Sequence, residues 1–458
     1  MSQRLPLLTK LAYGLGDLGT AIEANILVFF LLPFLTNVAG IPAGLAGTVI
    51  LVGKVWDGVN DPLIGVMSDR TRSAFGRRRL WMLWGSLPLA LSFVALWWIP
   101  TPGQLWSLFG YYVVVSLLFQ TFYTAVNLPY SALTPELTED YDERTSLVNI
   151  RFAFSIGGSL LSGIFFLPLV NALGVDRAAG HLWGSLVWAG LGLVSLWVCV
   201  FAIREKSSHP SASLPIWQEL RTVFRNRSYL FVIGIYLCAW LGVQFTASII
   251  PYYITYWMGL PDAWIGFVIL AVQGTAFCML FVWNQVCRFS DKKHVFLWGM
   301  GLWLIAQVGL FQVQPGQTTL LLILSAVAGM GVSVAYLIPW AMIPDVIDAD
   351  EVETGQRREG IYYAFMVFLQ KMGLALGLQG IGWVLQGSGF ISSVVGATPP
   401  VQPASALLAL RLAIGPIPAA VLVLGMILAW FYPITRQVHA TIRQSLVERQ
   451  PHPTLPPT

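Results

Sequence analysis

The stretch "KVWDGVNDP" brings two carboxylates, an amide and an ammonium group into an otherwise apolar run: Asp57, Asp61, Asn60 and Lys54. In a helix, positions 54, 57 and 61 lie on one face, and Asn60 flanks Asp61. Carboxylate and amide oxygens at one depth suit Na⁺ or Li⁺, and two adjacent acids can also share a proton. A structural ion pair between Lys54 and Asp57 is the alternative, and the two interpretations are compatible.

The composition places this stretch in a membrane. The chain has 458 residues, of which 56% are hydrophobic and 10% charged, and its mean hydropathy is +0.69. Soluble domains carry about 25% charged residues, so this chain cannot cover a water-facing surface. Its 19 Trp and 43 Gly fit membrane helices, where Trp marks the interfaces and Gly permits close helix contact. The sequence therefore predicts a polytopic membrane protein.

Twelve apolar segments are long enough to cross a bilayer, since about 20 residues span it as a helix. In the first half of the chain they are 10–37, 41–67, 80–100, 104–133, 147–172 and 182–203. In the second half they are 229–258, 262–287, 295–313, 317–346, 357–386 and 407–434. We expect an all-α integral membrane fold with twelve transmembrane helices in two pseudo-symmetric six-helix bundles. The predicted domains are bundles at 1–203 and 229–434, a cytoplasmic linker at 204–228, and a cytoplasmic tail at 435–458.

Basic residues gather on alternate loops, and this bias predicts the orientation. The loop "SDRTRSAFGRRR", the linker, and the loops at 288–293 and 357–358 are basic, whereas the opposite loops carry almost no Lys or Arg apart from Arg177. Both termini and the linker are therefore predicted to be cytoplasmic. The linker stretch "LPIWQELRTVFRNRSYLF" is either an amphipathic helix on the membrane surface or a plain tether. The tail ends in a Pro-rich stretch that we expect to be disordered.

Arginines of the loop after the second span are candidates for a cytoplasmic gate. They would latch this face of the protein onto acidic partners such as Asp69. The arginines expected to do so are Arg70, Arg72, Arg77 and Arg78.

The two halves of the chain resemble each other. "LPYSALTPELTEDYDERTSLVNIRFAFSIGG" begins at Leu128, and "IPWAMIPDVIDADEVETGQRREGIYYAFMVFLQKMG" begins at Ile338. Each has a Pro next to an aromatic residue, a second Pro, an acidic loop, and then a Gly-containing aromatic helix. A repeat of about 210 residues is typical of a duplicated six-helix unit, the architecture of the major facilitator superfamily. No GxSxG, HExxH, Walker A or Rossmann pattern is present, so an enzyme is not predicted.

Four further charged residues lie inside apolar spans: Asp17, Glu23, Arg151 and Lys371. A charge at mid-membrane costs about 2.5–3.5 kcal/mol by insertion scales, so each should face a cavity or another charge. Arg151 and Lys371 occupy matching positions of the two repeats and either compensate the acids or take part in gating or substrate binding. Asp17 and Glu23 are six residues apart and lie on different faces. Each either contacts substrate or is solvated near a helix end.

The sequence resembles the glycoside–pentoside–hexuronide:cation symporters, the melibiose permease-like branch of the major facilitator superfamily. The resemblance runs through all twelve spans and is carried by "KLAYGLGDLG", "VWDGVNDPLIGVMSDRTRSAFGRRR", "YTAVNLPYSALTPEL" and "TGQRREGIYYAFMVFLQK". In that family, acids and an amide of the second helix bind the coupling cation together with a threonine of the fourth. The implied cation-binding, and hence metal-binding, residues are Asp57, Asn60, Asp61 and Thr124.

The resemblance is weaker for the substrate. The family's melibiose-type members bind sugar hydroxyls through two aspartates, which here read Ala21 and Asn127, and two tryptophans here read Ser131 and Tyr336. Loss of both carboxylates removes strong hydroxyl acceptors. For Tyr123, Tyr130 and Tyr336, simple packing is the alternative role. The substrate-binding residues that we expect are Glu23, Tyr123, Asn127, Arg151, Tyr336 and Lys371.

Together these features predict a secondary active transporter that couples Na⁺ or H⁺ to symport of a sugar or related polar organic solute by alternating access. We expect no cofactor other than the coupling ion, no nucleic-acid partner, and a functional monomer in a bacterial inner membrane. One alternative is cation-coupled transport of a lysophospholipid-like amphiphile, which the smaller residues Ala21 and Ser131 would suit. Another is a membrane receptor that binds ligand without counterflow.

Overall fold

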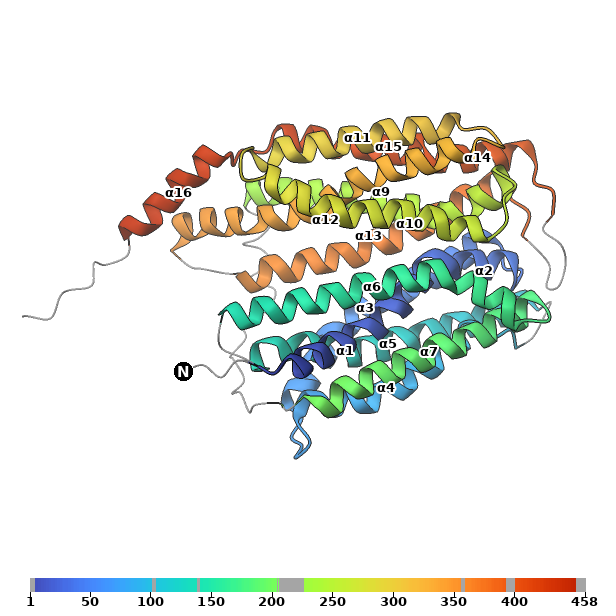
Figure 1. Ribbon diagram of the computed structural model, residues 1–458, viewed down its shortest axis with the longest axis horizontal. Coiled ribbons are helices and arrows are strands. Elements are labelled where there is room, and N and C mark those ends of the chain that lie inside the picture. Colours follow the sequence, from blue (N-terminus) through green and yellow to red (C-terminus); the bar gives the residue numbers. More distant parts are fainter. Residues whose placement is uncertain are drawn as a thin grey trace, which may run out of the picture. The chain divides into compact units, whose positions relative to one another are not determined.

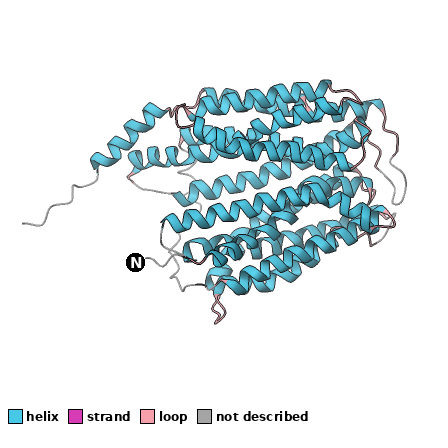
Figure 2. Cartoon of the chain, in the orientation of Figure 1, coloured by secondary structure: helices cyan, strands magenta, loops and turns pink. Residues whose placement is uncertain are grey.

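The structure, a computed structural model, describes residues 5–100, 104–137, 141–203, 205, 226–355, 359–392 and 400–449. Every regular element within these ranges is a helix (Figures 1 and 2). The predicted linker helix around 216–224 and the Pro-rich end at 450–458 lie outside the described residues.

The helices of the first half are α1 (Leu7–Ile26), the π-helical η1 (Leu27–Leu31), α2 (Leu32–Asn37), α3 (Ala43–Arg70), α4 (Arg77–Ala95), α5 (Leu105–Leu137), α6 (Tyr141–Leu173) and α7 (Arg177–Ala202). Those of the second half are α9 (Arg227–Tyr252), the π-helical η2 (Tyr253–Trp257), α10 (Ala263–Val286), α11 (Lys292–Gln312), α12 (Thr318–Thr354), α13 (Glu359–Gly387), α14 (Ala404–Ile414), α15 (Pro416–Trp430) and α16 (Arg436–Arg449).

The described helices cover all of the predicted spans. Ten helical segments of the described chain are long and apolar enough to cross a membrane. The two other predicted spans form α3, of 28 residues, and α4, of 19 residues, whose mean hydropathy is lowered by polar side chains. In α3 these are the side chains of the "KVWDGVNDP" stretch. The residues of the candidate cation site are therefore the ones that lower the mean hydropathy of this helix.

The first helix of each half contains a π-helical segment near its end. Pro33 follows η1 closely, and Pro251 lies just before η2. Proline lacks the N–H that would continue the regular bonding pattern, and a π-helical turn is one way for the backbone to adapt. The two distortions are similar in kind, although the proline follows the π-helical segment in the first half and precedes it in the second.

The chain divides into two compact units. The first comprises Met1–Ser211, Gln244–Leu270 and Leu374–Ala413, and the second comprises Ala212–Val243, Ala271–Gly373 and Ile414–Thr458. The first unit thus contains α1 to α7 together with η2 and parts of α9, α10, α13 and α14. The boundaries predicted from the sequence repeat stay a prediction.

Close helix packing in the first unit depends on small residues. A Cβ atom at Gly19 of α1 would lie only 2.7 Å from the Gly192 carbonyl oxygen of α7, so a larger residue would separate these helices. Between α3 and α5, a Cβ atom at Gly53 would clash with the Ser116 side chain. These contacts fix α1 against α7 and α3 against α5, the two pairs that carry the buried acids.

The second unit has its own apolar core, in which Trp303, Tyr236 and Tyr362 are fully buried.

The last helix, α16, was not foreseen in the predicted tail. It is joined to α12 by His439, whose Nε2 lies 3.1 Å from the Asp348 carboxylate. Lys292 at the start of α11 donates to Asp345 of α12 at 2.6 Å.

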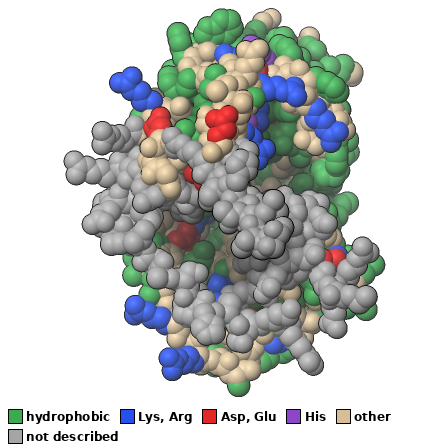
Figure 3. Space-filling model, turned by 90° about the vertical axis from the view of Figure 1, so that its left-hand side faces the viewer, with side chains coloured by type: hydrophobic (Ala, Val, Ile, Leu, Met, Phe, Trp, Pro, Cys, Tyr) green, Lys and Arg blue, Asp and Glu red, His purple; other side chains and the backbone are tan. Residues whose placement is uncertain are grey.

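Lys and Arg side chains are visible on the face drawn in Figure 3. The cytoplasmic location of the termini and the linker stays a prediction from the loop charges.

Candidate functional site

Two acids of α3 meet one hydroxyl of α5. The Thr124 hydroxyl lies 2.8 Å from Asp57 Oδ1 and 3.0 Å from Asp61 Oδ1. Asp57 is fully buried, and Thr124 is 2% exposed. A hydroxyl has one proton and can donate to only one carboxylate oxygen at a time. The structure therefore brings the predicted Asp57, Asp61 and Thr124 together as a cluster of oxygens with excess negative charge.

The amide of the predicted cation set is also buried. Asn60 is 4% exposed, and its Nδ2 has no hydrogen-bond partner among the described residues. An unpartnered buried N–H group is costly and is suited to a hydrogen-bond acceptor, so the amide oxygen, and not this nitrogen, is the atom that could bind a cation. Asn60 thus contributes a further polar group beside Asp61 on α3.

Lys54 touches the cluster from one side. Its Nζ lies 3.9 Å from Asp57 Oδ2 and donates to Gln120 Oε1 at 3.2 Å. It also lies 5.9 Å from the centre of the Tyr123 ring. The ion-pair interpretation of Lys54 and Asp57 is confirmed, and it coexists with the oxygen cluster. Gln120 was missed in the sequence, although its position four residues before Thr124 places it on the same helix face.

A second charged cluster joins α1 to α6. Arg151 Nε lies 3.2 Å from Asp17 Oδ2, and Arg151 Nη2 donates to Ser131 Oγ at 3.1 Å. The guanidinium also stacks 5.0 Å from the centre of the Tyr130 ring. The charge-compensation interpretation of Arg151 is therefore confirmed. Packing is confirmed for Tyr130, whose ring stacks on Tyr13 at 5.0 Å.

The other predicted substrate residues of the first unit are buried or half-buried. Glu23 is 1% exposed, and Asn127 Oδ1 is buried without a hydrogen-bond partner among the described residues. The Tyr123 ring lies 5.9 Å from Lys54 Nζ and packs against the Phe119 ring, with ring centres 5.7 Å apart. The expectation that Asp17 or Glu23 is solvated near a helix end is wrong, since Asp17 is only 7% exposed and the carboxylate of each is enclosed by neighbouring helices.

Tyr336 and Lys371 belong to the second unit. Tyr336 on α12 packs edge-on against Trp240 of α9, with ring centres 5.7 Å apart. Lys371 lies on α13. Their substrate-binding role stays a prediction.

The predicted gate arginines divide into two pairs. Arg70 and Arg72 are exposed, whereas Arg77 Nε lies 3.6 Å from Glu205 Oε1. The backbone N–H of Arg78 donates to Glu205 Oε2 at 3.1 Å. Glu205 was missed as the acidic partner, and the Asp69 side chain lies outside the described residues. The sequence places Glu205 on the predicted cytoplasmic side, because it follows the 182–203 span, but it does not indicate that this acid pairs with Arg77.

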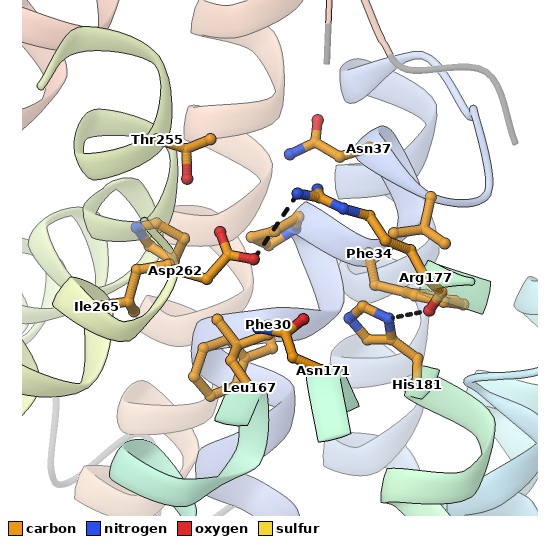
Figure 4. A pocket seen from close by; sticks show the side chains of 13 residues that line it. Phe30, Phe34, Asn37, Leu167, Asn171, Arg177, His181, Thr255, Asp262 and Ile265 are labelled. Atoms are coloured by element: carbon orange, nitrogen blue, oxygen red, sulfur yellow. Dashed lines mark hydrogen bonds and ion pairs between the residues drawn. The ribbon is translucent and has the colours of Figure 1, made fainter. Parts of the chain in front are cut away.

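A polar pocket lies in the first unit where α2, α6, α7, η2 and α10 meet (Figure 4). Arg177 and Asp262 face each other across it, with Nη2 3.8 Å from Oδ2. His181 Nδ1 donates to the Arg177 carbonyl oxygen at 2.6 Å. Nearby, the hydroxyls of Thr36 and Tyr252 are 2.7 Å apart. Arg177, the exception to the loop-charge pattern, is thus an ion-pair partner that links segments from both halves of the sequence.

Comparison with known sequences gives one family and several relatives. Residues 12–436 match the family described as MFS/sugar transport protein. The chain is 47% identical to "Uncharacterized symporter sll1374" of Synechocystis sp., over 98% of each chain. It is 29% identical to "Putative glycoside/cation symporter YagG" of Escherichia coli, over 97% of this chain and 96% of the relative. It is also 29% identical to "Putative sulfoquinovose importer" of Salmonella typhimurium, over 98% of this chain and 94% of the relative.

Solved structures share the fold at low sequence identity. The nucleoside transporter NupG aligns with a TM-score of 0.64 and 12% identity, over 93% of this chain and 100% of that one. The D-xylose-proton symporter aligns with a TM-score of 0.63 and 15% identity, over 93% of this chain and 97% of that one.

Proposed function

The chain belongs to the MFS/sugar transport protein family, and on that premise we propose that it couples a cation, Na⁺ or H⁺, to symport of a sugar or related polar organic solute. The major facilitator fold and the resemblance to glycoside–cation symporters are confirmed by the matches above. The chain is a multi-pass membrane transporter and not an enzyme.

The observation that carries the proposal is the shared Thr124 hydroxyl. Thr124 can donate its hydroxyl proton to only one of Asp57 and Asp61 at a time. The carboxylate oxygen of the other aspartate then lies close to the hydroxyl oxygen without receiving a hydrogen bond from it. A cation held between these oxygens would offset the repulsion of the two acids, and the Asn60 amide oxygen can add a ligand. Lys54 competes for Asp57, which keeps the site from binding a cation too tightly to release it.

Tyr123 supports a link between cation and solute binding. It directly precedes Thr124 on α5, and its ring centre lies 5.9 Å from Nζ of Lys54, the neighbour of Asp57. Cation binding at Asp57 would change the electric field at Tyr123 and so favour solute binding. Thermodynamic linkage makes this effect reciprocal.

The solute would bind in the first unit to Tyr123, Asn127 and Arg151, with Glu23 close by. Asn127 Oδ1 offers an unpartnered buried acceptor for a hydroxyl group. Arg151 supplies a planar donor that suits a carboxylate or sulfonate as well as a hydroxyl. The sugar-related names of the similar proteins favour a polar solute, and we do not propose the amphiphile.

Alternating access would require a closure at each face of the membrane. We assign the Arg177–Asp262 pair, which joins segments from both halves of the sequence, to the closure at the face opposite the cytoplasm. The Arg77–Glu205 contact joins two segments of the first half, so the cytoplasmic closure by the predicted arginines stays a prediction. The protein would act as a monomer in the inner membrane, with both termini in the cytoplasm.

Proteoliposomes holding the full chain test this function. Uptake of labelled sulfoquinovose, D-xylose and a β-glucoside would be measured under an inward Na⁺ gradient, an inward proton gradient, and no gradient. We expect one cation gradient to drive accumulation of at least one probe above its external concentration. Uptake that only equilibrates, at the same rate in all three conditions, would overturn the proposed coupling.

A further inference from the structure

Glu23 differs from the other acids of the first unit because nothing in the described chain pairs with it. It lies in the last turns of α1, is 1% exposed, and has no hydrogen-bond partner for its Oε2 among the described residues. Asp17, six residues earlier on the same helix, is by contrast held by Arg151 at 3.2 Å. The cation-site oxygens belong to α3 and α5, whereas Glu23 belongs to α1.

The surroundings of Glu23 are small and electrically neutral where α1 meets α7. A Cβ atom added to Gly192 would lie 3.3 Å from Glu23 Oε1, so α7 approaches the carboxyl group with backbone only. Ser195, three residues after Gly192 on α7, donates its hydroxyl to the Gly192 carbonyl oxygen at 2.8 Å and not to Glu23. Trp188 of α7 carries a buried N–H, but this donor has no hydrogen-bond partner among the described residues, so it does not bind Glu23 in this conformation.

The helices packed around α1 bring other titratable groups to this region, and the two basic ones are bonded elsewhere. Arg151 is bound to Asp17 and Ser131. His181 donates to the Arg177 carbonyl oxygen. The titratable and charged groups concerned are Tyr13 and Asp17 on α1, Tyr123 on α5, Arg151 on α6, and His181 and Cys199 on α7.

A carboxylate in such a place is far less stable than the neutral acid. Removing an ionised group from water without a partner has a large cost, whereas the protonated acid loses much less on burial. Proton binding at Glu23 and water access to the α1–α7 contact are therefore coupled. When water reaches the carboxyl group the O–H bond can break, the proton leaves as hydronium, and a hydrated carboxylate remains.

We propose that Glu23 is a proton-binding site of this transporter, separate from the cation site at Asp57, Asp61 and Thr124. In the conformation described here it holds its proton, and it releases the proton when a conformational change hydrates α1. The protonated state follows from the surroundings of Glu23 alone. The use of this proton in the transport cycle rests on the proposed alternating access. One proton would cross the membrane in each cycle in which Glu23 is protonated from one face and hydrated from the opposite face.

Infrared difference spectroscopy of the purified full chain tests the protonated state without any solute. At neutral pH the wild type should show the carbonyl-stretch band of a buried, weakly hydrogen-bonded carboxylic acid, which shifts in D₂O. Glu23→Gln should lose this one band. Asp176→Asn should keep it, because Asp176 is an exposed acid that caps α7. A band that is absent from the wild type, or unchanged in Glu23→Gln, would overturn the proposal.

A second variant covers the case in which Glu23→Gln does not fold. Gly192→Ala keeps the acid but places a methyl group 3.3 Å from its Oε1, so the band should persist at a shifted frequency. A band that does not move in Gly192→Ala would place the acid elsewhere and overturn the assignment. Cation-driven uptake without the band would sink only this inference, whereas the band without any driven uptake would sink only the proposed function.

Discussion

The acids of α3 and those of α1 have the same chemistry but opposite surroundings. On α3, Asp57 and Asp61 share one hydroxyl and have Lys54 beside them, so negative charge is concentrated in one polar place. On α1, Asp17 is fully engaged by Arg151, and Glu23 lies against the glycine backbone of α7. The comparison teaches that burial alone does not define a cation site. What the α3 acids have, and the α1 acids lack, is a second carboxylate within reach of the same donor.

Removing either α3 acid should have the largest effect on cation binding. Asp57→Asn or Asp61→Asn leaves one carboxylate at Thr124 and removes the excess charge that attracts a cation. We expect cation affinity to fall at least about 100-fold, on the order of 3 kcal/mol for a lost charged ligand. Equilibrium cation binding to the purified protein measures this. Asp176→Asn is the matched control, since asparagine also caps a helix.

Breaking the α1–α6 pair should cost stability instead of cation binding. Asp17→Asn leaves the charge of Arg151 without its partner, and Arg151→Gln leaves the charge of Asp17 without its partner. Both charges are mostly buried, since the Arg151 side chain is 22% exposed and the Asp17 side chain 10%. We expect each single variant to lose about 3–5 kcal/mol and the double variant to recover a large part of it. Thermal unfolding in detergent measures the stability of the two single variants and the double variant, and so ranks them. A double variant less stable than both singles would contradict the pairing.

Changing the shared hydroxyl should have an intermediate effect on the α3 site. Thr124→Ala removes the donor and a ligand but leaves both acids, so we expect about a tenfold loss of cation affinity. Thr124→Ser retains the hydroxyl and should bind nearly as the wild type does. Equal affinities for the Ala and Ser variants would show that the hydroxyl contributes nothing to binding.

The smallest effect is expected at the half-exposed Arg177–Asp262 pair. Arg177 is 45% exposed and Asp262 22%, so water screens their attraction. We expect Arg177→Gln to change stability by about 0–1 kcal/mol. If the pair holds a closure, the charge-exchanged double variant Arg177→Asp/Asp262→Arg should transport better than either single exchange. Transport equally low in all three would remove this pair from the closure.

Much of this arrangement follows from sequence, and the rest depends on tertiary contacts. Helical spacing predicted that Lys54, Asp57 and Asp61 share a face, and the apolar runs predicted the spans. Spacing could not supply Thr124, which is 67 residues from Asp57 and entered through the family resemblance. Arg151 was expected to compensate an acid, but the choice of Asp17 over Glu23 depends on which face of α1 meets α6.

Other features had no local signal. Glu205 as the partner of Arg77 requires α4 and the end of α7 to lie together. The α16 helix lies in a polar tail segment whose composition did not predict a membrane span or a docked helix, and its contact through His439 depends on α12. The π-helical segments depend on how the backbone adapts to Pro33 and Pro251, and proline alone does not specify that response.

Binding of ²²Na⁺ to the purified full chain tests the central claim most directly. Wild type, Asp57→Asn, Asp61→Asn and Asp176→Asn would be compared, with proton uptake followed in the same samples. The account predicts saturable binding of Na⁺, or of a proton in its place, by the wild type and Asp176→Asn, and loss of that binding in both α3 variants. Binding that survives in Asp57→Asn and Asp61→Asn, or a wild type that takes up neither cation, would contradict it.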